Sequence, residues 1–235
     1  MTDEFIQAGR QAAGGDPNVL APVNQSVCRG LAALTAISVV AMLLARYARY
    51  EELGFALIVV ASTSFVLIAL FAGGLGSWYG RLVVAALVFC WLGDVLGPSS
   101  FLSGVGAFLL AHLGFIGAFL SRGLTAKRCL ATAGAVLLVS GSLFMWLYPH
   151  VPEEQHLLIF AYVFVISAMV VLAGGVRDGG ALIFVAAVTF YVSDIFVARW
   201  RYVSPGLVNG VICYPLYYAA CVMFAFSVLG SRQNR

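Results

Sequence analysis

Asp94 and Asp194 are the only two of the ten acidic residues that fall inside long apolar segments of this sequence. If those segments span a membrane, each charged carboxylate costs at least about 2.5–3.5 kcal/mol on insertion scales, so the pair predicts a functional site. Two acids in a pocket of low dielectric constant do not both ionise cheaply. We therefore expect one to donate a proton and the other to act as a base or to stabilise a cation. The simpler alternative is that both are structural hydrogen-bonding acids.

Two further polar side chains accompany these acids. His112 lies mid-way along another apolar segment, and Tyr162 lies about two turns into a third. Either side chain can position a water molecule or hydrogen-bond a carboxyl group. A histidine in a helical bundle can equally be a satisfied polar group without a chemical role. We predict a catalytic set of Asp94, Asp194, His112 and Tyr162.

Cationic and aromatic residues follow at the ends of the same segments. Arg199 and Arg201 come five and seven residues after Asp194 and can hold a lipid phosphate by charge-assisted hydrogen bonds. Ordinary helix-end snorkelling is the alternative for both. Tyr214 and Tyr218 can contact a choline headgroup by cation–π attraction, or can be packing or interfacial aromatics.

The last apolar segment carries a stripe of polar residues. Asn209, Cys213, Tyr217 and Cys221 recur every four residues, which places them along one slowly drifting face of a helix that Pro215 should kink. We include Asn209 and Tyr217, together with Tyr214 and Tyr218, among the candidate substrate-binding residues.

The composition predicts that membrane-spanning helices position these residues. Hydrophobic residues make up 62% of the 235 positions and charged residues 10%, whereas a soluble domain is about 45–50% apolar and about 25% charged. A membrane span needs roughly 20 apolar residues, which leaves room for about eight. Because the segment 101–121 is rich in small residues, which let helices approach closely in lipid, we expect it at the centre of the bundle. We predict an all-α polytopic bundle of eight transmembrane helices over residues 28–47, 53–72, 80–97, 101–121, 129–148, 155–175, 180–200 and 205–229.

Eight spans place both termini on one side of the membrane. The tail, the even-numbered loops and the C-terminus carry nine of the thirteen Lys and Arg residues, and the odd-numbered loops carry four. The positive-inside rule therefore predicts that both termini are cytoplasmic. We divide the chain into a polar tail (1–26), which does not have the pattern of a cleavable signal peptide, a transmembrane domain (27–230) and a C-terminal tail (231–235). Twelve Arg against one Lys indicate a bacterial gene of high GC content, and so an inner-membrane protein; a eukaryotic relative would lie in the endoplasmic reticulum.

Several function classes are poorly supported. The five cysteines have no metal-type spacing, and the sequence contains no P-loop and no G-x-S-x-G motif. The basic residues are scattered instead of forming a run that follows phosphates. We expect no metal, no cofactor and no nucleic-acid partner.

A set of ordered motifs extends from the third predicted span to the eighth. With these residues the sequence resembles the YhhN-like integral membrane lysoplasmalogenases. Ala186 stands for a family glycine, Phe115 for a tyrosine and Cys221 for a glutamine, and Ser62, Thr63 and Ser64 lie where a Lys-Pro pair is expected. The motifs are Gly93-Asp94; Phe101, Gly104, Phe108, His112 and Phe119; Tyr162, Ile166 and Met169; Phe190, Ser193-Asp194, Ala198 and Arg201; and Tyr217-Tyr218.

The resemblance implies a reaction and a substrate. The reaction is hydrolysis of the vinyl ether bond of a lysoplasmalogen within the membrane, which releases a fatty aldehyde and a glycerophospho-headgroup. A proton delivered to the alkene carbon gives an oxocarbenium-like cation that water attacks, a demand similar to that of glycoside hydrolysis by two carboxyl groups. Ser193, beside Asp194, and Arg201 join the expected substrate-binding residues.

Two other functions remain open. A proton-coupled transporter also uses intramembrane Asp and His, although the sequence shows no inverted repeat and no pair of broken helices. A non-catalytic lipid-binding protein is the other alternative.

Overall fold

The computed structural model describes residues 25–229 and consists of helices joined by short connections. Eight long helices lie where the sequence predicts eight spans, with every boundary within three residues of the prediction. The all-α fold is thus confirmed. The predicted tails (1–26 and 231–235) lie outside the described residues, except that Gln25 and Ser26 already belong to the first helix. The eight helices are α2 (Gln25–Tyr47), α3 (Glu51–Phe71), α4 (Trp78–Leu96), α5 (Phe101–Ser121), α6 (Ala126–Leu147), α7 (His156–Gly175), α8 (Gly180–Ala198) and α9 (Leu207–Ser227).

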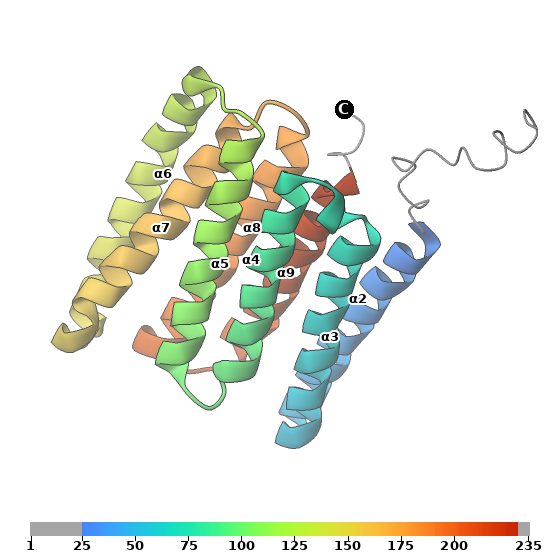
Figure 1. Cartoon of the computed structure of the whole chain (residues 1–235). Helices are drawn as coiled ribbons and strands as arrows, with labels where there is room; N and C mark the ends of the chain where they lie inside the picture. The colour runs from blue at the N-terminus through green and yellow to red at the C-terminus, as the bar shows by residue number, and fades with distance from the viewer. Residues whose placement is uncertain (1–24, 230–235) are drawn as a thin grey trace, which may run out of the picture.

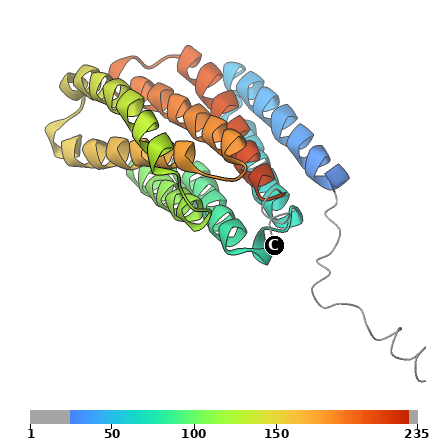
Figure 2. The same ribbon diagram turned by 90° about the horizontal axis from the view of Figure 1, so that it is seen from above.

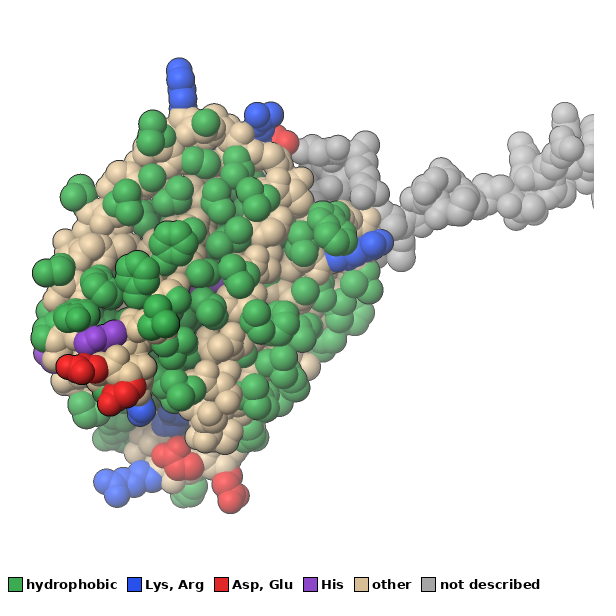
Figure 3. Space-filling view, turned by 60° about the vertical axis from the view of Figure 1, so that its left-hand side comes forward, with side chains coloured by type: hydrophobic (Ala, Val, Ile, Leu, Met, Phe, Trp, Pro, Cys, Tyr) green, Lys and Arg blue, Asp and Glu red, His purple; other side chains and the backbone are tan. Residues whose placement is uncertain are grey.

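The length and surface of the helices define an integral membrane protein. The apolar segments span 19 to 25 residues, which falls within the range of about 17–25 residues that a transmembrane helix needs. Large apolar side chains such as Leu130 and Leu157 are exposed on the outside of the bundle. Figure 3 shows hydrophobic side chains spread over the middle of one face, while charged side chains gather toward the two ends. Contact with lipid tails suits such an apolar surface, whereas its exposure to water would be unfavourable.

The helices form four antiparallel hairpins, namely α2–α3, α4–α5, α6–α7 and α8–α9, around a shared core (Figures 1 and 2). Helix α9 contacts α2, α3, α4 and α8, while α6 lies at the edge and packs mainly on α7. We expected the segment 101–121 at the centre of the bundle, but α9 is more central, because it buries ten residues against eight in α5 and contacts more of the other helices. Residues of α9 instead bring the hairpins together.

The small residues of α5 serve close packing against its hairpin partner α4. A Cβ atom added to Gly104 would lie 2.8 Å from Cα of Gly97, and one added to Gly114 would lie 3.0 Å from Cβ of Ala86. Glycine is therefore needed for the backbones to approach this closely, as is usual for helices in lipid.

The alternating helices place the beginning of α2 and the end of α9 at the same end of the bundle (Figure 1). The opposite end carries the connections α2–α3, α4–α5, α6–α7 and α8–α9, and we call it the mouth end. Asp94 lies two residues before the end of α4 and Asp194 four residues before the end of α8. Because both helices end at the mouth end, the two acids lie at similar depth.

A π-helical turn, η4 (Arg199–Val203), extends α8 at the mouth end. Turns of this kind are rare and occur frequently at functional sites, because they change the direction in which successive side chains project. Here the turn leads into the connection to α9, and it carries both arginines that the sequence analysis singled out.

Candidate active site

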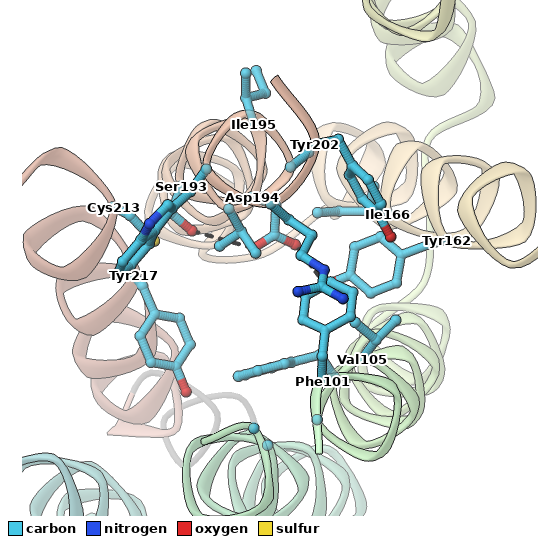
Figure 4. A pocket seen from close by; sticks show the side chains of 18 of the residues that line it. Phe101, Val105, Tyr162, Ile166, Ser193, Asp194, Ile195, Tyr202, Cys213 and Tyr217 are labelled. Atoms are coloured by element: carbon cyan, nitrogen blue, oxygen red, sulfur yellow. Dashed lines mark hydrogen bonds between the residues drawn. The ribbon is translucent and has the colours of Figure 1, made fainter. Parts of the chain in front are cut away.

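A cavity of about 570 Å³ opens at the mouth end of the bundle. All eight helices contribute to its lining, and most of the lining side chains are apolar or aromatic. Its volume falls within the range of about 300–1,000 Å³ that is usual for small-molecule sites. Asp94 and Asp194 both line this cavity. Figure 4 shows Asp194, Tyr162 and Tyr217 pointing into the space between the helices.

Three hydroxyl groups surround one oxygen of Asp94. Tyr217 and Tyr218 of α9 donate hydrogen bonds of 3.0 and 3.2 Å to Oδ2, and Ser62 of α3 donates a third hydrogen bond to the same atom. These hydroxyl groups replace the hydrogen bonds from water that a carboxylate loses when it is buried. Among the described residues no side chain is bonded to Oδ1 of Asp94, so this oxygen is left for a molecule in the cavity.

Ser62 is suited to either protonation state of Asp94. Its hydroxyl oxygen lies 2.9 Å from the carbonyl oxygen of Ile58 as well as beside Asp94. A serine hydroxyl carries one hydrogen and two acceptor positions. It can therefore donate to Oδ2 of an ionised Asp94, or turn its hydrogen to the carbonyl oxygen of Ile58 when Asp94 is neutral. A group that gains and loses a proton benefits from such a neighbour.

Asp194 has a different set of neighbours. The hydroxyl of Tyr162 donates a hydrogen bond of 2.7 Å to Oδ2, and Nε2 of the fully buried His112 lies 3.7 Å from the same oxygen. Ser193 is directed mainly to the backbone, since its hydroxyl lies 2.6 Å from the carbonyl oxygen of Phe190 and 3.5 Å from Oδ1 of Asp194. Tyr162 is therefore the principal hydrogen-bond donor to this carboxylate.

An aromatic cluster joins the surroundings of the two acids. The ring of Phe190 meets the ring of His112 at 4.9 Å and the ring of Tyr217 at 5.3 Å, both in edge-to-face geometry. His112 lies next to Asp194, whereas Tyr217 binds Asp94. Packing of this kind fixes ring orientations, so both carboxylates are held by side chains with little rotational freedom.

The predicted cationic residues occupy two different positions. Arg201 lines the cavity, with its guanidinium 4.6 Å from the centre of the Phe101 ring. Arg199 donates a hydrogen bond of 2.5 Å to Asn209, whose side-chain amide in turn donates to the carbonyl oxygen of Ser204 at 2.7 Å. Arg199 and Asn209 thus hold the connection between η4 and α9, and neither lines the cavity.

The predicted aromatic and catalytic residues also divide by position. Tyr214 and Tyr217 line the cavity, whereas Tyr218 and His112 are buried behind it and touch it only through Asp94 and Asp194. Within residues 25–229 no group of three or more His, Cys, Asp or Glu side chains is arranged to hold a metal ion.

The site predicted from the sequence did not include two residues that the structure places there. Ser62 was noted only as a departure from a family pattern, although a serine in an apolar span is itself a signal of a buried polar partner. Arg46 entered only the count of charges for topology, but it lines the cavity. Their partners lie on other helices, and nothing in the local sequence identified them.

The fold and the cavity define a class of protein: an integral membrane protein of eight helices with two aspartates in a pocket that opens near one membrane surface. The chain belongs to the YhhN family, whose model matches residues 55–228. The resemblance drawn from the sequence motifs is thereby confirmed.

Curated relatives carry a more specific name. The chain is 31% identical over 148 residues to a lysoplasmalogenase of Mycobacterium tuberculosis, which covers 59% of this chain and 56% of that protein. It is 30% identical over 158 residues to lysoplasmalogenase TMEM86B of Sus scrofa, which covers 65% of this chain and 66% of the relative. The chain thus spans little more than half the length of the mycobacterial relative. No solved structure shows significant similarity to this chain.

Proposed function

We propose that this protein is a membrane-embedded hydrolase that cleaves the vinyl ether bond of lysoplasmalogens, which are 1-alkenyl lysophospholipids. The observation that carries the proposal is the pair of aspartates that line one apolar cavity with separate hydrogen-bond partners. The family membership and the names of the relatives support the same substrate class.

In the proposed mechanism Asp94 acts as the acid. Its Oδ2 accepts three hydrogen bonds, and no described side chain is bonded to Oδ1, so we assign the transferable proton to Oδ1. Transfer of this proton to the outer alkene carbon leaves an oxocarbenium ion at the carbon bonded to the ether oxygen. The three hydroxyl donors then stabilise the carboxylate that remains, in a site where water is largely excluded.

Asp194 takes the second role. Its carboxylate stabilises the oxocarbenium ion and accepts a proton from the attacking water, while Tyr162 and His112 hold the carboxylate in place. Addition of water gives a hemiacetal, which separates into a fatty aldehyde and a glycerophospho-headgroup bearing a free hydroxyl. Two carboxyl groups divide the work of glycoside hydrolysis in a comparable way.

The cavity provides places for both parts of the substrate. The apolar lining between the helices takes the hydrocarbon chain, and Arg201 and Tyr214 lie where the polar headgroup meets water. No cofactor enters this reaction. We further propose that both termini face the cytoplasm and that the host membrane is a bacterial inner membrane, following the distribution of Arg and Lys.

Packing below the acids favours hydrolysis over proton-coupled transport. The rings of Phe115 and Phe224 stack at 4.1 Å, and Phe119 adds a third ring at 5.9 Å from Phe224. These three side chains are fully buried on the side of the acids away from the mouth end. A proton relay needs polar groups at successive depths, and this apolar layer interrupts such a path.

The test is release of aldehyde from 1-alkenyl lysophospholipid by the purified protein. Asp94→Asn and Asp194→Asn should each lower the rate by at least about 100-fold, because each removes a proton-transfer group. Asp178→Asn is the matched control, since Asp178 is exposed in the loop between α7 and α8, away from the cavity. All variants must retain the thermal stability of the unaltered protein. Absence of aldehyde over several headgroups and pH values would refute the proposal, and full activity in both aspartate variants would refute the mechanism.

A further inference from the structure

Arg46 is a second cation that lines the cavity, in addition to Arg201. It stands one residue before the end of α2 and lines the cavity at the mouth end. Its aliphatic stem packs on Gly54 of α3, where an added Cβ would lie 3.3 Å from Cγ of the arginine. The guanidinium lies 5.1 Å from the centre of the Tyr214 ring of α9. Three helices therefore fix the position of this side chain.

The guanidinium of Arg46 forms no salt bridge with any carboxylate of residues 25–229. Its Nε is buried and makes no hydrogen bond. In the described part of the chain no carboxylate lies within 4.0 Å of the guanidinium. A buried N–H group without an acceptor is unfavourable, and more so when it is charged. Interaction with the end of the α2 dipole favours the charge but supplies no acceptor for Nε. This arrangement indicates that an anion from outside the chain completes the site.

Arg201 lines the same cavity. It comes from η4, is exposed, and rests on the ring of Phe101. Seven residues separate it from Asp194, which corresponds to a rise of about 10 Å toward the mouth end. The three-carbon glycerol backbone likewise separates the vinyl ether of a lysoplasmalogen from its phosphate. A lipid with its ether bond at the aspartates would thus have its phosphate toward the mouth end, where Arg201 and Arg46 both line the cavity.

We propose that Arg46 and Arg201 bind the lipid phosphate together, and that Arg46 makes the site select phosphate-bearing ether lipids over neutral ether glycerols. The proposal rests on the proposed function for the ether lipid itself. The planar guanidinium suits this role, because it presents paired N–H groups to phosphate oxygens. Tyr214 keeps the Arg46 guanidinium in place by a cation–π contact.

The test measures binding without hydrolysis. The protein in nanodiscs is titrated with 1-alkyl lysophosphatidylcholine, whose saturated ether is not cleaved by this chemistry, and with 1-alkylglycerol of the same chain length. Binding is followed by the rise in the thermal unfolding midpoint. The unaltered protein should bind the phospholipid at least about tenfold more tightly than the alcohol, because only the phospholipid offers the arginines an acceptor for charge-assisted hydrogen bonds. Equal affinity for the two lipids would overturn the proposal.

Variants assign the preference to Arg46. Arg46→Gln should lower the affinity for the phospholipid by about 10- to 100-fold and leave the affinity for 1-alkylglycerol unchanged. Arg49→Gln is the matched control. It removes a positive charge from the same end of the bundle, but Arg49 does not line the cavity. If Arg46→Gln does not fold, Arg46→Met, which keeps an unbranched stem against Gly54, takes its place. An equal loss for both lipids, or no loss, would show that Arg46 has only a packing role.

Two further measurements complete the test. One distinguishes a lipid phosphate from free phosphate, and the other distinguishes failure of the phosphate site from failure of the proposed hydrolysis. Inorganic phosphate alone should give no Arg46-dependent stabilisation, since it lacks the chain that fills the cavity; a stabilisation equal to that of the lipid would overturn the lipid assignment. Aldehyde release from 1-alkenyl lysophospholipid is measured on the same preparations. Arg46-dependent binding without aldehyde release would refute the proposed hydrolysis and support the phosphate site. Aldehyde release together with unchanged binding in Arg46→Gln would support hydrolysis and refute the phosphate site.

Discussion

The hydroxyl of Tyr162 lies 2.7 Å from Oδ2 of Asp194 and connects α7 to α8 at the wall of the cavity. The two residues are 32 positions apart in the chain. This hydrogen bond gives Asp194 its principal donor, because Ser193 is committed to the backbone of Phe190.

Removal of that donor should therefore impair hydrolysis. Tyr162→Phe keeps the ring against His112 and removes only the hydroxyl, so we expect the rate of aldehyde release to fall by about 10- to 100-fold, the effect of one hydrogen bond to a charged group. The matched control is Tyr79→Phe, which removes a buried hydroxyl that is bonded to Ser227 at the other end of the bundle. If both variants lose the same activity, the effect is structural and Tyr162 has no special role.

We expect Ser62 to affect catalysis through its hydrogen bond to Asp94, with little effect on stability. Ser62→Ala removes one of three donors to Oδ2, and we expect a decrease in turnover of about tenfold with little change in the unfolding midpoint. Ser64→Ala provides the comparison on the same helix, since Ser64 bonds only the carbonyl oxygen of Val60 among the described contacts. Ser62→Thr retains a hydroxyl and should recover part of the activity. A Ser62→Ala protein as active as the Ser64→Ala protein would contradict the assignment.

The close contact of α4 and α5 predicts a difference between two glycines. Gly104→Ala places a methyl group 2.8 Å from Cα of Gly97, which should destabilise the protein by about 1–3 kcal/mol through overpacking. Gly106→Ala meets no atom within 4 Å and should be neutral. Thermal unfolding in detergent compares the two variants. Equal midpoints would mean that the helices separate without cost and that the glycine contact is unimportant.

Arg199 and Asn209 should affect stability and not substrate binding. Arg199→Ala breaks its hydrogen bond to Asn209, whereas Asn209→Ala breaks that bond and also the bond to Ser204. We expect Arg199→Ala to lower stability by about 1.5–3 kcal/mol, Asn209→Ala to lower it by more, and the double variant to lose little more than Asn209→Ala alone. The KM for 1-alkenyl lysophospholipid should remain close to that of the unaltered protein. A raised KM in Arg199→Ala at unchanged stability would instead assign this arginine to the headgroup.

The sequence by itself determined the eight helices and their boundaries. In lipid every backbone N–H and C=O group must be bonded within the segment, so long apolar runs have no alternative to helices. The same reasoning marked Asp94 and Asp194, because a carboxylate is rare in a segment that must be apolar. Their similar depth followed from counting residues along helices that run in the same direction.

Tertiary structure decided which side chains meet. Neither the contact of Ser62 with Asp94 nor that of Arg199 with Asn209 follows from local sequence, because each depends on the rotation of one helix against another. Arg199 and Arg201 were equivalent in sequence, yet two residues correspond to about 200° around a regular helix, and the π-helical turn alters this angle further. Only Arg201 therefore faces the cavity, and Arg46 joins it from a helix 155 positions earlier in the chain.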